Sequence, residues 1–180
     1  PYLAQLPRAP YLLFVGAFGR HKGCDVLLRS YAGLHSAPPL VMIGYETGDA
    51  PREAEPLPPG AVMLRHWPHA AVMAAWRRSL SALAPSVSPD SCPTTVIEAM
   101  SAGRPVIASR IGGLPDLVRH GETGLLVEPG DPEALRQAIA RLLADPALCR
   151  RLGEAGRRRS ADLESSAVVP RIERAYEQLL

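Results

Sequence analysis

Short, uninterrupted apolar runs recur along this chain, and they constrain its fold more than any other feature. Most of them lead through a glycine or a polar loop into a segment with the spacing of an amphipathic helix. The runs occupy residues 11–15, 40–43, 62–64, 80–84, 105–109 and 124–127. Continuous rather than alternating apolar strands are typical of a sheet that helices cover on both faces. The pattern therefore predicts an α/β fold with a doubly wound parallel sheet.

Helical spacing follows three of these runs, over residues 24–34, 70–79 and 94–102. After residue 127 the pattern is helical only, and it predicts three additional C-terminal helices. The first begins at an Asp131 N-cap before Pro132, the second spans 147–159, and the third begins at Ser165 or Ser166. Residues 46–60 are rich in proline, glycine and acidic side chains, which indicates a surface insertion. We expect one domain over residues 1–180.

Composition excludes several classes of function. The 20 Lys and Arg residues nearly balance 18 Asp and Glu residues, and the net charge of +2 gives no general attraction to nucleic acid. The apolar runs are far shorter than the roughly 20 residues that a membrane-spanning helix needs. The three cysteines show no C-x-x-C spacing, so the sequence predicts no zinc site and favours a reducing compartment. We expect a cytoplasmic protein that binds no metal.

The first candidate binding loop, residues 16–23, follows the first strand and reads G-A-F-G-R-H-K-G. Glycines such as Gly16 let the backbone approach a ligand closely, and Arg20 and Lys22 supply positive charge that suits a diphosphate. Ligands of doubly wound sheets bind beyond the carboxyl ends of the strands, where this loop is expected to lie. A plain turn that carries two solvated cations is the alternative interpretation.

The second candidate loop runs from residue 85 into the helix at 94–102. Asp90 and Glu98 are separated by seven residues, so both carboxylates can reach one ligand that lies across the start of the helix. Thr94 and Thr95 offer hydroxyls and free amides to a phosphate there. Two alternatives stay open: Thr95 and Glu98 fit a capping box, and Asp90 fits a turn after Pro89.

Several motifs in this part of the chain resemble one known family. The segment 90–109 is followed by I-G-G-L-P-D-L-V at 111–118 and by H-G-E-T-G-L-L-V at 120–127. This order resembles the C-terminal domain of retaining GT-B glycosyltransferases of family 4. That family carries an acidic E-x7-E signature, then E-A-M-A-x-G-x-P-V, a Gly-Gly-x-x-E-x-V segment and a G-x-x-G-L-L-V strand. The resemblance covers about residues 11–144, and the family's G-R-x-x-x-x-K-G loop places Gly16, Lys22 and Gly23 in register.

The resemblance implies a Rossmann-like half of a GT-B fold that binds a nucleotide diphosphate sugar as the donor substrate. It implies that Lys22 contacts the donor diphosphate and Asp90 the transferred sugar, these two being the catalytic residues. Thr94 and Thr95 would contact the phosphates, and Glu98 the ribose hydroxyls. Enzymes of this kind use no metal or other cofactor, because cations and a helix dipole offset the charge of the leaving diphosphate.

The resemblance also implies a partner: an N-terminal half that binds the hydroxyl acceptor and is absent from this sequence. Without it, we expect the domain to bind its donor and not to turn it over. Any attachment to the inner face of the membrane would come only through that missing half. The residues do not show whether the nucleotide is UDP or GDP. They also do not identify the sugar or the acceptor.

Two residues depart from the family pattern. The family's arginine beside the first glycine of the loop is Ala17 here, and its first glutamate is Asp90, one methylene shorter. Arg20 is a candidate to replace the missing guanidinium, so it joins Gly16 among the predicted donor-binding residues. One alternative function is therefore a noncatalytic nucleotide-sugar-binding or scaffolding domain. A second is an epimerase or phosphorylase with the same architecture, which the spacing of Asp90 and Glu98 disfavours.

Overall fold

The computed structural model describes residues 1–48 and 56–178. Its centre is a six-stranded sheet with the strand order β3-β2-β1-β4-β5-β6, in which every neighbouring pair is parallel. The strands are β1 (Tyr11–Phe18), β2 (Leu40–Glu46), β3 (Ala61–Arg65), β4 (Ser79–Ala84), β5 (Val106–Ser109) and β6 (Gly124–Val127). This arrangement confirms the predicted doubly wound α/β sheet.

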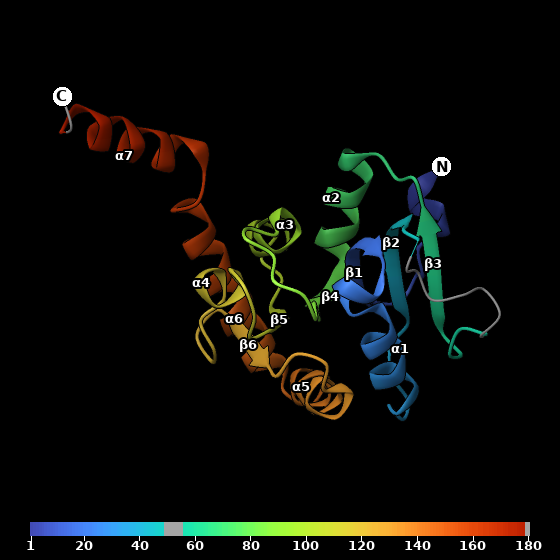
Figure 1. Cartoon of the computed structure of the whole chain (residues 1–180). Coiled ribbons are helices and arrows are strands. Elements are labelled where there is room, and N and C mark those ends of the chain that lie inside the picture. The colour runs from blue at the N-terminus through green and yellow to red at the C-terminus, as the bar shows by residue number, and fades with distance from the viewer. Residues whose placement is uncertain (49–55, 179–180) are drawn as a thin grey trace.

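Helices cover both faces of the sheet, which explains why its strands are apolar throughout (Figure 1). The helices are α1 (Cys24–Ala32), α2 (His69–Arg78), α3 (Thr94–Ser101), α4 (Leu114–Leu117), α5 (Pro132–Ala144), α6 (Pro146–Ala161) and α7 (Ser165–Glu177). Residues of α2, α3 and α4 pack with Leu13 and Val41 in one core cluster. Residues of α1, α5 and α6 pack with Leu12 and Met42 in the other. Adjacent strand residues therefore enter opposite cores.

The first strand is longer than predicted. Gly16 was expected to end it, yet Gly16, Ala17 and Phe18 continue to pair with β2. Gly16 lies opposite Gly44, where a Cβ on Gly44 would come within 1.8 Å of the Gly16 carbonyl oxygen. The two strands approach so closely because neither residue has a side chain at this point. The turn after β1 is accordingly the shorter segment 19–23, with a 3₁₀ turn at Arg20–Lys22.

The C-terminal helices follow the sequence pattern. The Asp131 carboxylate accepts hydrogen bonds from the amides of Glu133 and Ala134, which confirms the predicted N-cap of α5. Helix α7 begins at Ser165 and continues through Pro170, and none of its described residues is buried. It projects away from the sheet and the other helices in Figure 1. The short helix α4 was not predicted, because four residues carry too little periodicity to be recognised.

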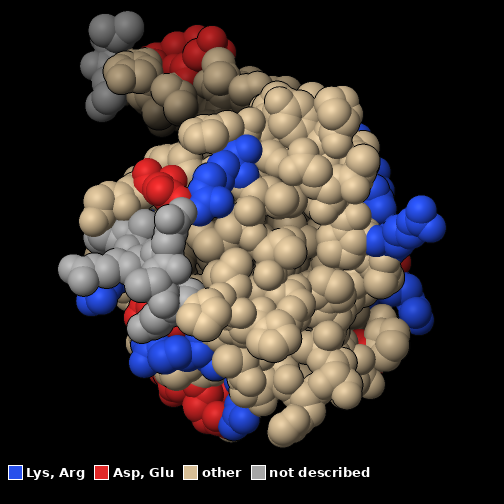
Figure 2. All heavy atoms as spheres, turned by 90° about the vertical axis from the view of Figure 1, so that its right-hand side faces the viewer, with Lys and Arg blue, Asp and Glu red and all other residues tan. Residues whose placement is uncertain are grey.

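Figure 2 looks on to the side of the molecule where β3 forms the sheet edge. Uncharged side chains make up most of this face, and residues of both charge signs lie scattered around its margin. Of the predicted insertion at 46–60, Glu46 belongs to β2 and Gly60 precedes β3, while residues 49–55 lie outside the described residues. The insertion therefore joins two neighbouring parallel strands.

Candidate functional site

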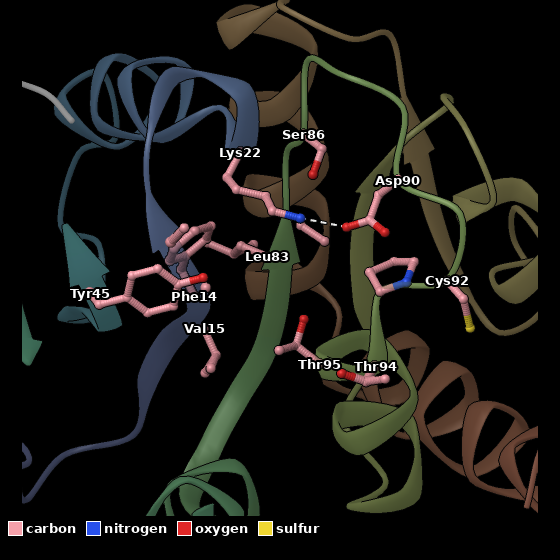
Figure 3. A pocket seen from close by; sticks show the side chains of 14 residues that line it. Phe14, Val15, Lys22, Tyr45, Leu83, Ser86, Asp90, Cys92, Thr94 and Thr95 are labelled. Carbon is pink, nitrogen blue, oxygen red and sulfur yellow. Dashed lines mark hydrogen bonds and ion pairs between the residues drawn. The ribbon is translucent and has the colours of Figure 1, made fainter. Parts of the chain in front are cut away.

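A cavity of about 280 Å³ opens between the carboxyl ends of β1 and β4. These two central strands are the point at which the strand order reverses, and open α/β sheets bind their ligands at that position. Its lining residues come from β1, β2 and β4, from the loops after β1 and β4, and from the start of α3 (Figure 3). They are Phe14, Val15, Gly16, Ala17, Lys22, Tyr45, Leu83, Ala84, Ser86, Asp90, Cys92, Pro93, Thr94 and Thr95.

Gly23 brings the loop after β1 into contact with the loop after β4. Its backbone is left-handed, with φ 71°, and an added Cβ would lie 1.9 Å from the carbonyl oxygen of Pro85. Only glycine combines this conformation with so close an approach to another backbone. The Lys22–Gly23 pair of the sequence motif thus has two parts: the glycine sets the contact between the loops, and the lysine beside it reaches the cavity.

Backbone hydrogen bonds join the same two loops. The amides of Val87 and Ser88 both donate to the carbonyl oxygen of His21, at 3.0 and 3.2 Å. The 3₁₀ turn at Arg20–Lys22 is therefore fixed against the segment that leads to Asp90. Residues that lie far apart in the sequence therefore become neighbours at the carboxyl ends of β1 and β4.

Lys22 and Asp90 form an ion pair at the mouth of the cavity, with the ammonium donating to a carboxylate oxygen. Their side chains are 28% and 23% exposed, so water screens the pair less than it would on an open surface. The hydrogen bond from Lys22 lowers the pKa of Asp90 from its usual 3.8, against the opposing effect of burial. Asp90 is consequently ionised at neutral pH.

Gly112 and Gly113 support the backbone of Asp90 from the other side. The amide of Gly113 donates to the Asp90 carbonyl at 2.7 Å. A Cβ on Gly112, whose φ is 57°, would lie 2.6 Å from both the nitrogen and the oxygen of Asp90. The Gly-Gly segment, which the sequence offered only as part of a resemblance, is a close-packing device that fixes the position of Asp90.

Thr94 and Thr95 lie at the first turn of α3, where the helix begins beside the cavity. The residue before the helix is Pro93, and no side chain caps this end. Figure 3 places both threonines on the side of the cavity across from Ser86, with the Lys22–Asp90 pair between. An uncapped helix start leaves amides and the positive end of the helix dipole available to an anion.

Glu98 lies one turn further along α3, outside the lining of the cavity. One carboxylate oxygen is 3.0 Å from Nε2 of His69, and the other accepts a hydrogen bond from Nε1 of Trp76 at 3.4 Å. Both partners belong to α2. The capping-box alternative is therefore wrong: α3 starts without a side-chain cap, and the carboxylate of Glu98 faces α2 instead.

The remaining predicted residues divide between the cavity and its surroundings. Gly16 and Ala17 line the cavity, and Ala17 is only 5% exposed. Arg20 is exposed and is not among the lining residues. The sequence analysis missed Ser86, which follows β4, and Tyr45, which lies near the end of β2; position at the carboxyl end of a strand is the signal that could have found them.

An open parallel sheet with a cavity and an uncapped helix start at its switch point is typical of α/β domains that bind nucleotides. The family of glycosyl transferases group 1 matches residues 4–159. The chain belongs to this family, which confirms the resemblance predicted from the motifs.

Similar proteins agree with this assignment. The chain is 31% identical, over 185 aligned residues, to D-inositol 3-phosphate glycosyltransferase of Thermobifida fusca, covering 94% of this chain and 42% of the relative. It is 32% identical to the solved structure of sucrose-phosphate synthase of Thermosynechococcus elongatus, with a TM-score of 0.80, covering 99% of this chain and 48% of that one. The chain thus spans about half the length of these relatives.

Two more distant structures share the fold. One is the C-terminal domain of the glycosyl transferase group 1 protein LpcC of Francisella tularensis, 19% identical with a TM-score of 0.72, covering 86% of this chain and 87% of that domain. The other is Anabaena Alr3699/HepE in complex with UDP-glucose, also 19% identical, with a TM-score of 0.78, covering 96% of this chain and 49% of that one. The fold is accordingly that of the C-terminal half of a GT-B protein.

Residues 1–48 and 56–178 contain neither a membrane-spanning helix nor a cluster of potential metal ligands. No helix in these ranges is long and apolar enough to cross a membrane. Within the same ranges, no three His, Cys, Asp or Glu side chains lie close enough to hold a metal ion together.

Proposed function

We propose that this chain is the donor-binding domain of a retaining glycosyltransferase that moves a sugar from a nucleotide diphosphate sugar to a hydroxyl acceptor. The observation that carries the proposal is the convergence of Lys22, Asp90 and the uncapped start of α3 on one cavity at the switch point of the sheet. The UDP-glucose in the Anabaena structure of the same fold supports a ligand of this class.

The charges of the site residues indicate where the diphosphate and the sugar of the donor bind. The diphosphate lies between the ammonium of Lys22 and the amides and hydroxyls of Thr94 and Thr95, because these are the groups that stabilise an anion. As the bond to the sugar breaks, negative charge grows on the leaving diphosphate, and the same groups offset it. Asp90, held ionised, accepts hydrogen bonds from hydroxyls of the transferred sugar.

Three further assignments complete the proposal. Gly16 leaves room for the donor at the floor of the cavity, and Glu98 accepts hydrogen bonds from the ribose. Arg20 supplies a second positive charge at the edge of the cavity. The acceptor is bound by an N-terminal domain of a longer chain, because residues 1–180 correspond to about half of the relatives. Residues 1–180 alone then bind the donor without turning it over.

Calorimetric titration in EDTA tests the proposal. UDP, GDP and ADP and their glucose or mannose conjugates are added to the chain, and at least one pair should bind with micromolar to millimolar affinity. A rise in the thermal unfolding midpoint with ligand concentration provides an independent measurement, because a ligand that binds only the folded state stabilises it. Binding of none of these compounds would overturn the proposal, and binding only with added magnesium would overturn its metal-free form.

One observation favours a second candidate, a binding domain without transferase activity. Ala17 brings a methyl group to the cavity where the family pattern has an arginine, so the site has one fewer cation for the leaving diphosphate. Turnover of labelled donor by the full-length protein discriminates between the two. Release of the sugar to an acceptor supports the transferase, and donor binding without any transfer or hydrolysis supports the binding domain.

A further inference from the structure

Ser86 is a buried polar residue with an unused hydrogen-bonding group. It is 6% exposed, and it lies two residues beyond the end of β4. The small exposed part of the residue belongs to the cavity lining, and Figure 3 shows the hydroxyl pointing toward the space that contains Lys22 and Asp90. Among the described residues, no hydrogen bond to this hydroxyl is found.

Other buried serines of the chain show how this hydroxyl differs. The hydroxyls of Ser79 and Ser160 donate to carbonyls three residues earlier, at 2.9 and 2.8 Å. Those of Ser30 and Ser81 have no partner among the described residues and are sealed from solvent. Ser86 is also buried and has no hydrogen-bond partner among the described residues, but unlike Ser30 and Ser81 it lines a cavity. Because the hydroxyl faces the cavity and has no protein partner among the described residues, it is available to hydrogen-bond a group that enters the cavity.

The surroundings of Ser86 indicate which part of a ligand it meets. The groups that attract an anion, Lys22 and the start of α3, account for a diphosphate. Asp90 is a carboxylate and repels phosphate oxygens, whereas it accepts readily from sugar hydroxyls. A serine hydroxyl donates one hydrogen bond and accepts others, which matches a sugar hydroxyl in either role. Together with Asp90, the Ser86 hydroxyl can therefore distinguish sugars by the positions of their hydroxyl groups.

We propose that Ser86 is a specificity residue that binds a hydroxyl of the transferred sugar of the donor. The inference rests on the proposed function, because it requires a nucleotide diphosphate sugar in this cavity. Ser86 and Asp90 then hold the sugar from neighbouring positions of one loop, and the diphosphate is bound without Ser86. A donor whose sugar lacks the matching hydroxyl leaves Ser86 unpaired again and binds less tightly.

The test compares two ligands that differ only by the sugar. The nucleotide sugar that binds the unchanged chain most tightly in EDTA, and its own nucleoside diphosphate, are titrated into Ser86→Ala. The variant should bind the nucleotide sugar about threefold to tenfold more weakly, as expected for the loss of one neutral hydrogen bond, and the nucleoside diphosphate within twofold of the unchanged chain.

Ser81→Ala is the matched control, because Ser81 is a buried serine without a partner among the described residues and does not line the cavity. It should change neither affinity. Ser86→Thr, which keeps the hydroxyl, should retain more affinity for the nucleotide sugar than Ser86→Ala does, and thermal unfolding confirms that each variant folds. If Ser86→Ala is destabilised, the comparison of the two ligands in Ser86→Thr and Ser86→Cys decides instead.

Equal weakening of both ligands by Ser86→Ala would overturn the assignment to the sugar, and so would unchanged affinity for the nucleotide sugar. Failure of the unchanged chain to bind any of the nucleotides is a different result, since it rejects the proposed function before Ser86 is tested.

Discussion

Lys22 and Asp90, 68 residues apart in the sequence, form an ion pair across the switch point of the sheet. The contact depends on backbone features of both loops: the left-handed Gly23 packed on Pro85, and Gly113 bonded to the Asp90 carbonyl. A cation for a diphosphate and a carboxylate for a sugar are thereby placed at one cavity.

Replacing Lys22 with Met should raise the pKa of Asp90 relative to the unchanged chain, because the hydrogen bond and the positive charge of Lys22 that lower it are lost while the effect of burial stays. In the unchanged chain, the pair stabilises the fold above pH 3.8, and this contribution disappears as the pH falls toward the lowered pKa of Asp90. Carbon-detected NMR titration of the Asp90 carboxyl measures the shift. A pKa that does not move in Lys22→Met would contradict the ion pair.

The same substitution should weaken binding of a nucleoside diphosphate by about tenfold to a hundredfold, as expected for one charge-assisted hydrogen bond. Arg29→Met provides the control, because Arg29 forms an exposed ion pair with Asp25 on α1, away from the cavity. Its affinity should equal that of the unchanged chain. Equal affinities of Lys22→Met and Arg29→Met would remove Lys22 from the site.

Gly23→Ala should destabilise the chain and weaken nucleotide binding together. The new Cβ would meet the Pro85 carbonyl oxygen at 1.9 Å and force the two loops apart. Gly130→Ala is the control, since Gly130 has a similar φ of 76° and a Cβ added there would meet no described atom within 4 Å. Chemical denaturation should show a loss about 1–3 kcal/mol larger for Gly23→Ala than for Gly130→Ala. Similar losses would mean that the loops adjust without cost.

Glu98→Gln should weaken nucleotide binding by about tenfold, because an uncharged amide is a poorer acceptor for ribose hydroxyls. Stability should change by less than about 1 kcal/mol, since α3 has no capping box to lose. Calorimetry and thermal unfolding provide the two readouts, with Glu154→Gln on the exposed surface of α6 as the control. Full affinity in Glu98→Gln would reject the ribose assignment and leave Glu98 as a partner of His69 and Trp76 alone.

Arg20 and Ala17 call for a double-mutant cycle. If Arg20 has replaced the missing arginine, Arg20→Ala should weaken diphosphate binding, Ala17→Arg should restore it, and the two effects should not add. The exposed position of Arg20 outside the cavity favours the opposite result, a change within twofold for Arg20→Ala. Titration of all four combinations at low salt decides, and additivity would remove Arg20 from the donor site.

Tyr11→Phe should remove a pH dependence at the alkaline end. Tyr11 donates to the carbonyl of Ala75 at 2.8 Å, and burial raises its pKa to about 12. The neutral phenol therefore stabilises the fold fully below pH 10, and this contribution is lost as the pH rises toward 12. Denaturation at pH 8 should show a loss of about 1 kcal/mol in Tyr11→Phe. Parallel stability curves of both chains above pH 10 would contradict this origin.

The strands and their cover of helices were predictable because buried strands and amphipathic helices leave simple patterns. The end of β1 was not, since Gly16 signals a turn by itself, and only the opposite Gly44 shows that two strands approach there. The N-cap Asp131 was predictable from local sequence. Glu98 was not, because the choice between a cap, a ligand contact and a partner on α2 depends on residues about 20 to 30 positions away.

For the site, the residue types and loops could be predicted, and the relations between them could not. Nothing in the sequence shows that Lys22 pairs with Asp90, because the contact depends on two loops that fold against each other. Ser86 was missed for a related reason: a serine is informative only when burial, a cavity and the lack of a partner coincide. These are properties of packing, which a single sequence does not display.

The hydrogen bonds from the amides of Val87 and Ser88 to the His21 carbonyl affect the thermodynamics of nucleotide binding. They tie the two walls of the cavity together in the folded chain, so a nucleotide that enters meets a pre-organised framework. Ordering of loops, which commonly reduces affinity, has already taken place during folding. What is left to change is mainly the partner of Lys22, which passes from the carboxylate of Asp90 to the phosphates of the ligand.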